Sequence, residues 1–242
     1  MRKDGPLIIS LDVSSKEELV SFIQRFNPDE KLTIKIGMEL FYGEGPSIVR
    51  NLLNLGYDVF LDLKLHDIPN TVRKGMKQIG KMGVSFTTVH ALGGSEMIKQ
   101  AKQGLLEGAS EAGVQPPKLL AVTELTSITP KGLAEEQNSR LPMVDQVVAL
   151  AKLARNSGAD GVITSPLELS ALKKEVGDDF WYVTPGIRPN DFPKDDQSRT
   201  STPTEAANAG SSALVVGRPI INATDPVTAY QNMMEEWLNA NR

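Results

Sequence analysis

Cysteine is absent from the 242 residues, and long apolar runs are absent as well. Without thiols the chain has no disulfide, no thiolate metal ligand and no cysteine nucleophile, as is usual for a protein of a reducing cytoplasm. The longest unbroken apolar run is Val147 to Ala151, five residues, whereas a membrane-spanning helix needs about 20. We therefore expect a cytoplasmic protein with no membrane segment.

The chain also lacks a large excess of one sign of charge, because it has 26 Lys and Arg residues and 30 Asp and Glu residues. The formal net charge of -4 provides no overall positive field for a polyanion such as nucleic acid. A local pocket for one small phosphate group is still compatible with this balance. The composition thus favours a small-molecule protein and argues against a nucleic-acid partner.

Short β-type runs recur along the chain, with helical patterns between them. Eight such runs can be recognised, and they begin near Leu7, Leu32, Asp58, Val84, Lys118, Asp160, Phe180 and Ser212. One strand and its following helix need about 30 residues, so the spacing predicts eight βα units. We expect an α/β fold, a (β/α)8 TIM barrel, as one domain over residues 1–242. The alternative, an open doubly wound sheet, would need a G-x-G-x-x-G loop after the first strand, and Leu11 to Lys16 contains none.

Glycine marks four of the expected junctions between a helix and the next strand. Gly56, Gly83, Gly158 and Gly210 each follow a helical pattern and precede a β-rich run. A glycine at this place can adopt the left-handed conformation that ends a helix. The repeated pattern supports the division into βα units.

Two connections after expected strands are unusually long. Residues 126–142 and 186–203 are polar, rich in proline and without apolar periodicity. Each follows a strand on the face where barrels keep their active sites. We expect these two loops to act as lids or substrate clamps.

Charged residues lie where several expected strands end, although barrel strands should be almost entirely apolar. Asp12, Lys35, the pair Asp62 and Lys64, and Arg218 belong to four different strands. Side chains alternate along a strand, so Asp62 and Lys64 should both face the barrel interior. Together these residues predict a polar site at the carboxyl ends of the strands.

Asp67 follows in the turn after Lys64. Two carboxylates near one ammonium group favour its charged form, which would make Lys64 a positioned acid. This pattern predicts proton transfer to the substrate.

The segment from Asp62 to Thr71, DLKLHDIPNT, resembles the signature of the orotidine 5'-phosphate decarboxylases. Further motifs fall in that family's order: LDV at 11–13, IKIG at 34–37, AVTELTS at 121–127, TPGIR at 184–188 and VVGRPI at 215–220. The resemblance covers nearly the whole chain. It implies a homodimeric barrel that converts orotidine 5'-monophosphate to UMP and CO2 in pyrimidine biosynthesis, with neither a metal nor an organic cofactor.

The same resemblance implies a role for each matching residue. Lys64 would protonate C6 of the pyrimidine, Asp62 would lie against the departing carboxylate, and Lys35 would complete the charged network. Asp67 would enter the site from the partner subunit.

The remaining matches concern the substrate's other groups. Asp12 and Lys35 would contact the ribose, with Thr71 of the partner closing the sugar pocket and Ile68 also contacting substrate. Thr126, or the adjacent Ser127, would read the amide edge of the base. The phosphate would be bound by four residues: Arg188, Gln197, Gly217 and Arg218. Independently of the resemblance, Arg218 and the backbone N–H groups after Gly217 lie where barrels commonly bind phosphate.

Three alternatives remain open at this point. A metal-dependent sugar-phosphate decarboxylase or hexulose-phosphate aldolase of the same superfamily shares the D-x-K-x-x-D pattern, but the ammonium of Lys35 would oppose Mg²⁺. An aldolase could use Lys35 or Lys64 to form a Schiff base, which requires a desolvated lysine without carboxylate neighbours. A nucleotide-phosphate sensor without catalysis would have no need of Lys64 between two carboxylates.

Overall fold

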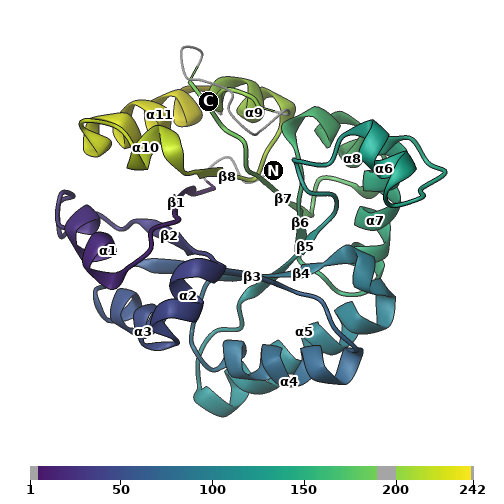
Figure 1. Ribbon diagram of the computed structural model, residues 1–242, viewed down its shortest axis with the longest axis horizontal. Coiled ribbons are helices and arrows are strands. Elements are labelled where there is room, and N and C mark those ends of the chain that lie inside the picture. The colour runs from purple at the N-terminus through teal and green to yellow at the C-terminus, as the bar shows by residue number, and fades with distance from the viewer. Residues whose placement is uncertain (1–4, 190–199, 241–242) are drawn as a thin grey trace.

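Eight parallel strands form a closed barrel in which each strand pairs with the next and β8 pairs with β1. The structure is a computed structural model and describes residues 5–189 and 200–240. Figure 1 shows the strands at the centre with helices arranged around them. The strands are β1 (Leu7–Leu11), β2 (Thr33–Ile36), β3 (Asp58–Leu65), β4 (Phe86–His90), β5 (Lys118–Val122), β6 (Gly161–Ile163), β7 (Trp181–Thr184) and β8 (Ala213–Val216). The predicted (β/α)8 barrel is confirmed, and each predicted strand opening lies within two residues of the observed one.

Helices follow every strand of the barrel. The α-helices are α1 (Lys16–Ile23), α2 (Met38–Glu44), α3 (Ser47–Asn54), α4 (Pro69–Gly80), α5 (Gly94–Ala112), α6 (Pro130–Glu135), α7 (Met143–Asn156), α8 (Leu169–Val176), α9 (Pro203–Ala209), α10 (Arg218–Ile221) and α11 (Pro226–Ala240). Two 3₁₀ turns, η1 (Ala91–Gly93) and η2 (Pro166–Glu168), precede α5 and α8. None of these helices is long and apolar enough, within the part of the chain described, to cross a membrane.

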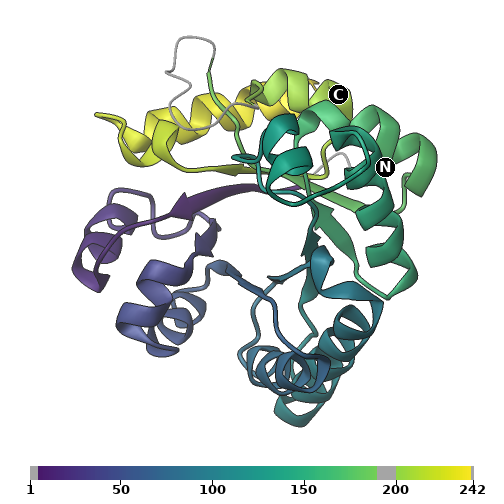
Figure 2. The same cartoon turned by 45° about the vertical axis from the view of Figure 1, so that its right-hand side comes forward.

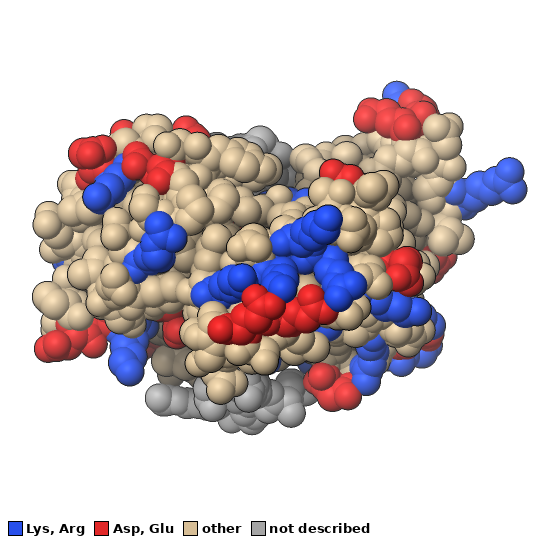
Figure 3. Space-filling model, turned by 90° about the horizontal axis from the view of Figure 1, so that it is seen from below, with Lys and Arg blue, Asp and Glu red and all other residues tan. Residues whose placement is uncertain are grey.

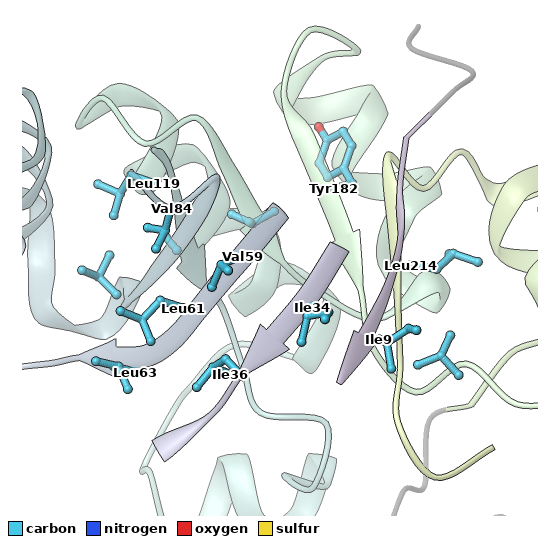
Figure 4. Close-up of a cluster of buried hydrophobic side chains, with 14 of the residues drawn as sticks. Ile9, Ile34, Ile36, Val59, Leu61, Leu63, Val84, Leu119, Tyr182 and Leu214 are labelled. Carbon is cyan, nitrogen blue, oxygen red and sulfur yellow. The ribbon is translucent and has the colours of Figure 1, made fainter. Parts of the chain in front are cut away.

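The core has two layers because successive strand residues point to opposite faces. Outward-facing residues such as Ile34, Val59 and Leu214 pack against the helices, as Figure 4 shows. Inward-facing residues fill the barrel with a second cluster: Ile8, Phe60, Phe86, Leu120, Val183, Ala213 and Val215. This inner cluster fills the barrel interior below the carboxyl ends of the strands.

The four junction glycines adopt the predicted left-handed conformation. Their φ angles are +85° at Gly56, +79° at Gly83, +90° at Gly158 and +90° at Gly210. A side chain at such an angle would be strained, which explains why glycine recurs at these helix ends.

Helices α4 and α5 pack against each other more closely than side chains on both would allow. A Cβ atom at Gly104 would lie 2.2 Å from the carbonyl oxygen of Arg73, and one at Gly108 would lie 2.0 Å from that of Lys77. Ion pairs join the same two helices, with Arg73 Nη2 2.5 Å from Glu107 Oε1, and Lys81, the residue after α4, has its Nζ 3.0 Å from Glu111 Oε2 of α5. Figure 3 views the molecule from below Figure 1, the side of α4 and α5, and shows basic and acidic side chains next to one another.

The first predicted long loop, residues 126–142, contains a short helix, α6, which its lack of apolar periodicity did not indicate. Thr129 caps this helix, accepting a hydrogen bond from the N–H of Gly132, and Pro130 occupies its first turn. A helix of six residues is too short to show an apolar repeat, so its only signals in the sequence are the capping residue and the proline that follows it.

In the second loop the described ends are joined, since Arg188 N–H donates to Ser201 O at 2.9 Å. Residues 190–199 lie outside the described residues.

The two ends of the barrel's sequence lie together. Helix α11 packs beside α9 and α10, as Figures 1 and 2 show. From α11, the fully buried indole of Trp237 donates a hydrogen bond to the carbonyl oxygen of Gly5 at 2.9 Å. The strand pair β1–β8 is therefore reinforced from outside by the last helix.

Candidate active site

A cavity of about 500 Å³ opens at the carboxyl ends of the strands. This volume lies in the range typical of small-molecule sites, and the position is the one where barrels carry their active sites. Residues from seven strand ends or their loops line it: Ser10, Asp12, Lys35, Phe60, Asp62, Lys64, Val122, Glu124, Leu125, Thr126, Ile163, Thr164, Pro185, Gly186, Arg188, Val215, Gly217, Arg218 and Ile221. The cavity thus brings together eight of the predicted site residues.

Alternating charges form a row along one wall of the cavity. Lys35 Nζ lies 3.1 Å from Asp12 Oδ1 and 3.4 Å from Asp62 Oδ2. Lys64 Nζ lies 2.8 Å from the same Asp62 Oδ2. Strands β1, β2 and β3 are neighbours in the barrel, so their carboxyl ends place these groups in the order Asp12, Lys35, Asp62, Lys64. Such a row is an ion network in which each buried charge has an opposite neighbour.

Asp62 is the buried centre of this row, with a side chain 10% exposed. Burial opposes its ionisation, but the ammonium groups of Lys35 and Lys64 and hydrogen bonds from Lys64 and Thr88 outweigh it. The net result is a pKa of Asp62 below its usual value, so the carboxylate stays charged at neutral pH.

The backbone at Lys64 is unusual, because its φ angle is +50°. The pairing of β3 with β4 shifts register between Leu61 and Leu65. Despite this irregularity, the side chain of Lys64 lines the cavity beside Asp62, on the side that strand alternation predicted. A non-glycine residue at positive φ is uncommon, and such residues are enriched at active sites.

Two arginines line the cavity from the ends of the neighbouring strands β7 and β8. Gly217 precedes α10, and Arg218 begins that helix next to the end of β8. Arg188, only 5% exposed, reaches the cavity from the connection after β7. Guanidinium groups in the lining of a cavity suit a phosphate group, which they can bind through several N–H donors.

Thr126 lines the cavity, whereas Ser127 is exposed and is not one of the lining residues. Of the two hydroxyl groups left open by the sequence, Thr126 is therefore the better placed to meet a ligand.

Three predicted residues lie outside the cavity of their own chain. Asp67, Ile68 and Thr71 are exposed in the turn before α4 and in its first turns. The Asp67 carboxylate accepts a hydrogen bond from the N–H of Ile68 at 2.6 Å and, within the described residues, forms no ion pair with Lys64. Their predicted contribution to a partner's site stays a prediction. Gln197 lies outside the described residues.

Sequence reasoning missed several polar residues of the site, among them Ser10, Thr88 and Glu124, and also Thr164 in the cavity lining. Ser10 donates from its hydroxyl to Asp12 Oδ2 at 2.7 Å, and Thr88 donates to Asp62 Oδ1 at 2.8 Å. Glu124 lines the cavity and accepts amide N–H groups from Gln137 and Gln146, at 3.2 and 3.3 Å. Strand alternation could have indicated Ser10, two residues before Asp12, but nothing in the sequence indicates the partners of Glu124.

The described residues contain no group of three His, Asp or Glu side chains that could hold a metal ion. The two carboxylates of the charged row, Asp12 and Asp62, both contact the ammonium group of Lys35. A divalent cation at that place would meet this positive charge.

Comparisons with known proteins agree with this geometry. A model of the family described as Orotidine 5'-phosphate decarboxylase / HUMPS family matches residues 5–233. An orotidine 5'-phosphate decarboxylase of Lactobacillus acidophilus is 55% identical over 97% of this chain and 99% of its own. One of Staphylococcus saprophyticus is 48% identical over 96% and 97%.

Solved structures give the same result. The crystal structure of orotidine 5'-phosphate decarboxylase from Lactobacillus acidophilus has a TM-score of 0.87 and 52% sequence identity, covering 97% of this chain and 99% of that one. Barrel, cavity and sequence motifs therefore agree, and the chain belongs to the orotidine 5'-phosphate decarboxylase / HUMPS family.

Proposed function

We propose that this protein is a carboxy-lyase that converts orotidine 5'-monophosphate to UMP and CO2 in pyrimidine biosynthesis. The names of its relatives at 52–55% identity support this substrate. The observation that carries the proposal is the row Asp12, Lys35, Asp62, Lys64 along one wall of the cavity. A substrate with a carboxylate to lose and a carbon to protonate needs a fixed negative group and a fixed acid side by side.

In the proposed reaction the bond between C6 and the carboxylate breaks, and its electron pair remains on C6 as CO2 leaves. The ammonium group of Lys64 stabilises this negative charge electrostatically and then transfers a proton to C6. Lys64 regains its proton from solvent after the product departs. Asp62, beside the substrate's carboxylate, repels the ground state and relieves that repulsion as neutral CO2 forms.

The rest of the cavity binds the nucleotide in this proposal. Arg188, Gly217 and Arg218 bind the phosphate, with Gln197 joining from the loop after β7. Thr126 reads the amide edge of the pyrimidine, and Asp12 and Lys35 contact the ribose hydroxyls. Asp67, Ile68 and Thr71 complete the site of the other subunit of a homodimer.

An assay on EDTA-treated protein tests the proposed function. We expect release of CO2 from orotidine 5'-monophosphate with UMP as product, unchanged by EDTA because the proposed chemistry uses only side chains. Lys64→Ala should abolish turnover, whereas Lys74→Ala, an exposed lysine on α4, should leave it intact.

Two outcomes would contradict the proposal. Turnover that stops with EDTA would favour the metal-dependent sugar-phosphate enzymes of the same superfamily. Borohydride-trapped adducts on Lys35 or Lys64 would instead favour Schiff-base chemistry.

A further inference from the structure

Thr88 is a fully buried threonine in the middle of β4, at 0% exposure. It lies two residues after Phe86, which belongs to the inner cluster, so its side chain also points into the barrel. It is not one of the residues that line the cavity, and it therefore lies behind the charged row instead of facing a ligand.

The hydroxyl of Thr88 joins the backbone of one residue of the row to the side chain of another. The N–H of Lys64 donates to Thr88 Oγ1 at 2.9 Å, and Thr88 Oγ1 donates to Asp62 Oδ1 at 2.8 Å. Because the hydroxyl accepts one bond, its own proton is directed toward the carboxylate. One buried oxygen thus fixes both residues.

Lys64 and Asp62 both depend on a hydrogen bond from another strand to keep their conformation. Lys64 has a φ of +50° where the pairing of β3 with β4 is interrupted, so a side chain supplies the acceptor for its N–H. Asp62 meets Lys64 and Lys35 through Oδ2, at 2.8 and 3.4 Å, while its Oδ1 is held by Thr88. Without Thr88 the carboxylate could rotate, and the Lys64 backbone would lose the bond that favours its strained conformation.

We propose that Thr88 is a positioning residue for decarboxylation, which holds Asp62 and Lys64 in their reactive arrangement without touching the substrate. The inference rests on the proposed function. It concerns the chemical step more than substrate binding, because the hydrogen bonds of Thr88 go to Asp62 and Lys64 and to none of the residues proposed to bind the phosphate or the ribose.

The charge of Asp62 gives the proposal a second readout. Burial opposes ionisation of Asp62, and the hydrogen bond from Thr88 is one of the contributions that lower its pKa. The charged groups around it are Lys35 on β2 and Lys64 on β3, with Asp12 on β1 beyond Lys35. The titratable ring of His90 on β4 also interacts with Asp62. Loss of the Thr88 hydroxyl should raise the pKa of Asp62, so the acid limb of the kcat profile should move to higher pH.

The test uses Thr88→Val, which keeps the shape and removes the hydroxyl, and Thr88→Ser, which keeps the hydroxyl. The matched control is Thr87→Val, because Thr87 is also 0% exposed, faces the helices, and has a hydroxyl without a hydrogen-bond partner among the described residues. For Thr88→Val we expect kcat to fall by about tenfold or more while KM and the Kd of UMP stay within about twofold. Thr88→Ser should restore most of kcat, and Thr87→Val should behave as the unaltered protein.

A measurement without substrate separates this inference from the proposed function. The Lys64 amide should exchange with solvent faster in Thr88→Val than in the unaltered protein or in Thr87→Val, because its acceptor is gone. Should Thr88→Val fail to fold, Thr88→Cys provides a similar volume with a weak donor and should lie between the serine and valine variants.

Each result decides one of the two claims. If the unaltered protein does not decarboxylate orotidine 5'-monophosphate, the proposed function is wrong, whatever the exchange rates. If it does, and Thr88→Val retains kcat or loses it only together with substrate binding, Thr88 is not a positioning residue.

Discussion

His90 shows how the charged row affects a neighbouring residue outside the cavity lining. It ends β4, and its ring centroid lies 5.6 Å from that of His66. Its Nδ1 is buried without a hydrogen-bond partner among the described residues. Burial, together with the nearby His66 and the ammonium group of Lys64, holds the pKa of His90 below its usual value, although Asp62 acts in the opposite direction. His90 is therefore neutral in the folded protein under conditions in which an exposed histidine is charged.

This lowered pKa makes stability depend on pH with a definite sign. Below about pH 6.5 the unfolded chain binds a proton at His90 that the folded chain does not. The free energy of unfolding therefore decreases as the pH is lowered. The loss continues until the pH reaches the folded pKa, at no more than about 1.4 kcal/mol per pH unit for one proton. Urea unfolding between pH 7.5 and pH 5 should show a smaller decline for His90→Gln than for the unaltered protein. An equal decline in both would show that His90 is not the group responsible.

Single residues of the site differ in how far the sequence predicted them. Asp12, Lys35, Asp62 and Lys64 were predictable because a charge at the end of an apolar strand is conspicuous. Thr88 was not, since its hydroxyl matters only through the register shift of β3, and the sequence carries no sign of that shift. Glu124 was missed for a similar reason, because its amide partners are Gln137 in the long connection after β5 and Gln146 in α7, and no local pattern links them to Glu124.

Among the elements, α4 and α5 form a contact that leaves no room for a side chain at two of its glycines. Backbone meets backbone at Gly104 and Gly108, where a carbonyl oxygen of α4 occupies the place of a side chain. The helix boundaries at glycine and proline were predictable from local chemistry, but this packing depends on which two helices become neighbours. The short helix α6 was not predicted either, because its only signal is a cap followed by proline.

Replacement of Gly108 by alanine should destabilise the barrel although alanine favours helix formation. The new Cβ would lie 2.0 Å from the Lys77 carbonyl oxygen, so the helices must separate at a cost of about 1–3 kcal/mol. Gly43 in α2 is the control, because nothing lies within 4 Å of a Cβ there, and Gly43→Ala should gain up to about 1 kcal/mol. Urea unfolding of both variants measures the difference. Equal stabilisation in both would mean that α4 and α5 can move apart freely.

At the scale of the whole molecule, three residues expected in the site are exposed on the surface of their own chain. Asp67, Ile68 and Thr71 follow Lys64 closely in sequence but lie outside its cavity. A two-fold homodimer would explain this position, since the same surface segment of each subunit can then complete the other's site. Sequence physics alone could not predict this arrangement, because no pattern in one chain specifies which surface meets a second copy.

Mixed dimers provide the test of a shared site. Lys64→Ala and Asp67→Ala proteins should each be nearly inactive, but a heterodimer of the two has one site with both residues intact. After unfolding and reassembly of an equal mixture, activity should return to about a quarter of the unaltered level, because half of the dimers carry one intact site of two. A mixture of Lys64→Ala with the Lys64→Ala/Asp67→Ala double variant should stay inactive. Failure of the first mixture, with heterodimers shown to form, would contradict the shared site.

The hydrogen bond between Trp237 and Gly5 has a consequence for how the barrel is made. It joins residues 232 positions apart, and it lies beside the β1–β8 pair that closes the barrel. During synthesis β1 emerges before the other strands, but β8, its second pairing partner, is made only when almost the entire chain has been synthesised. Its unpaired edge is exposed during that time to the aggregation that open strands favour. We therefore expect that loss of α11 would weaken the closure of the barrel by β1 and β8 and prolong the exposure of this edge.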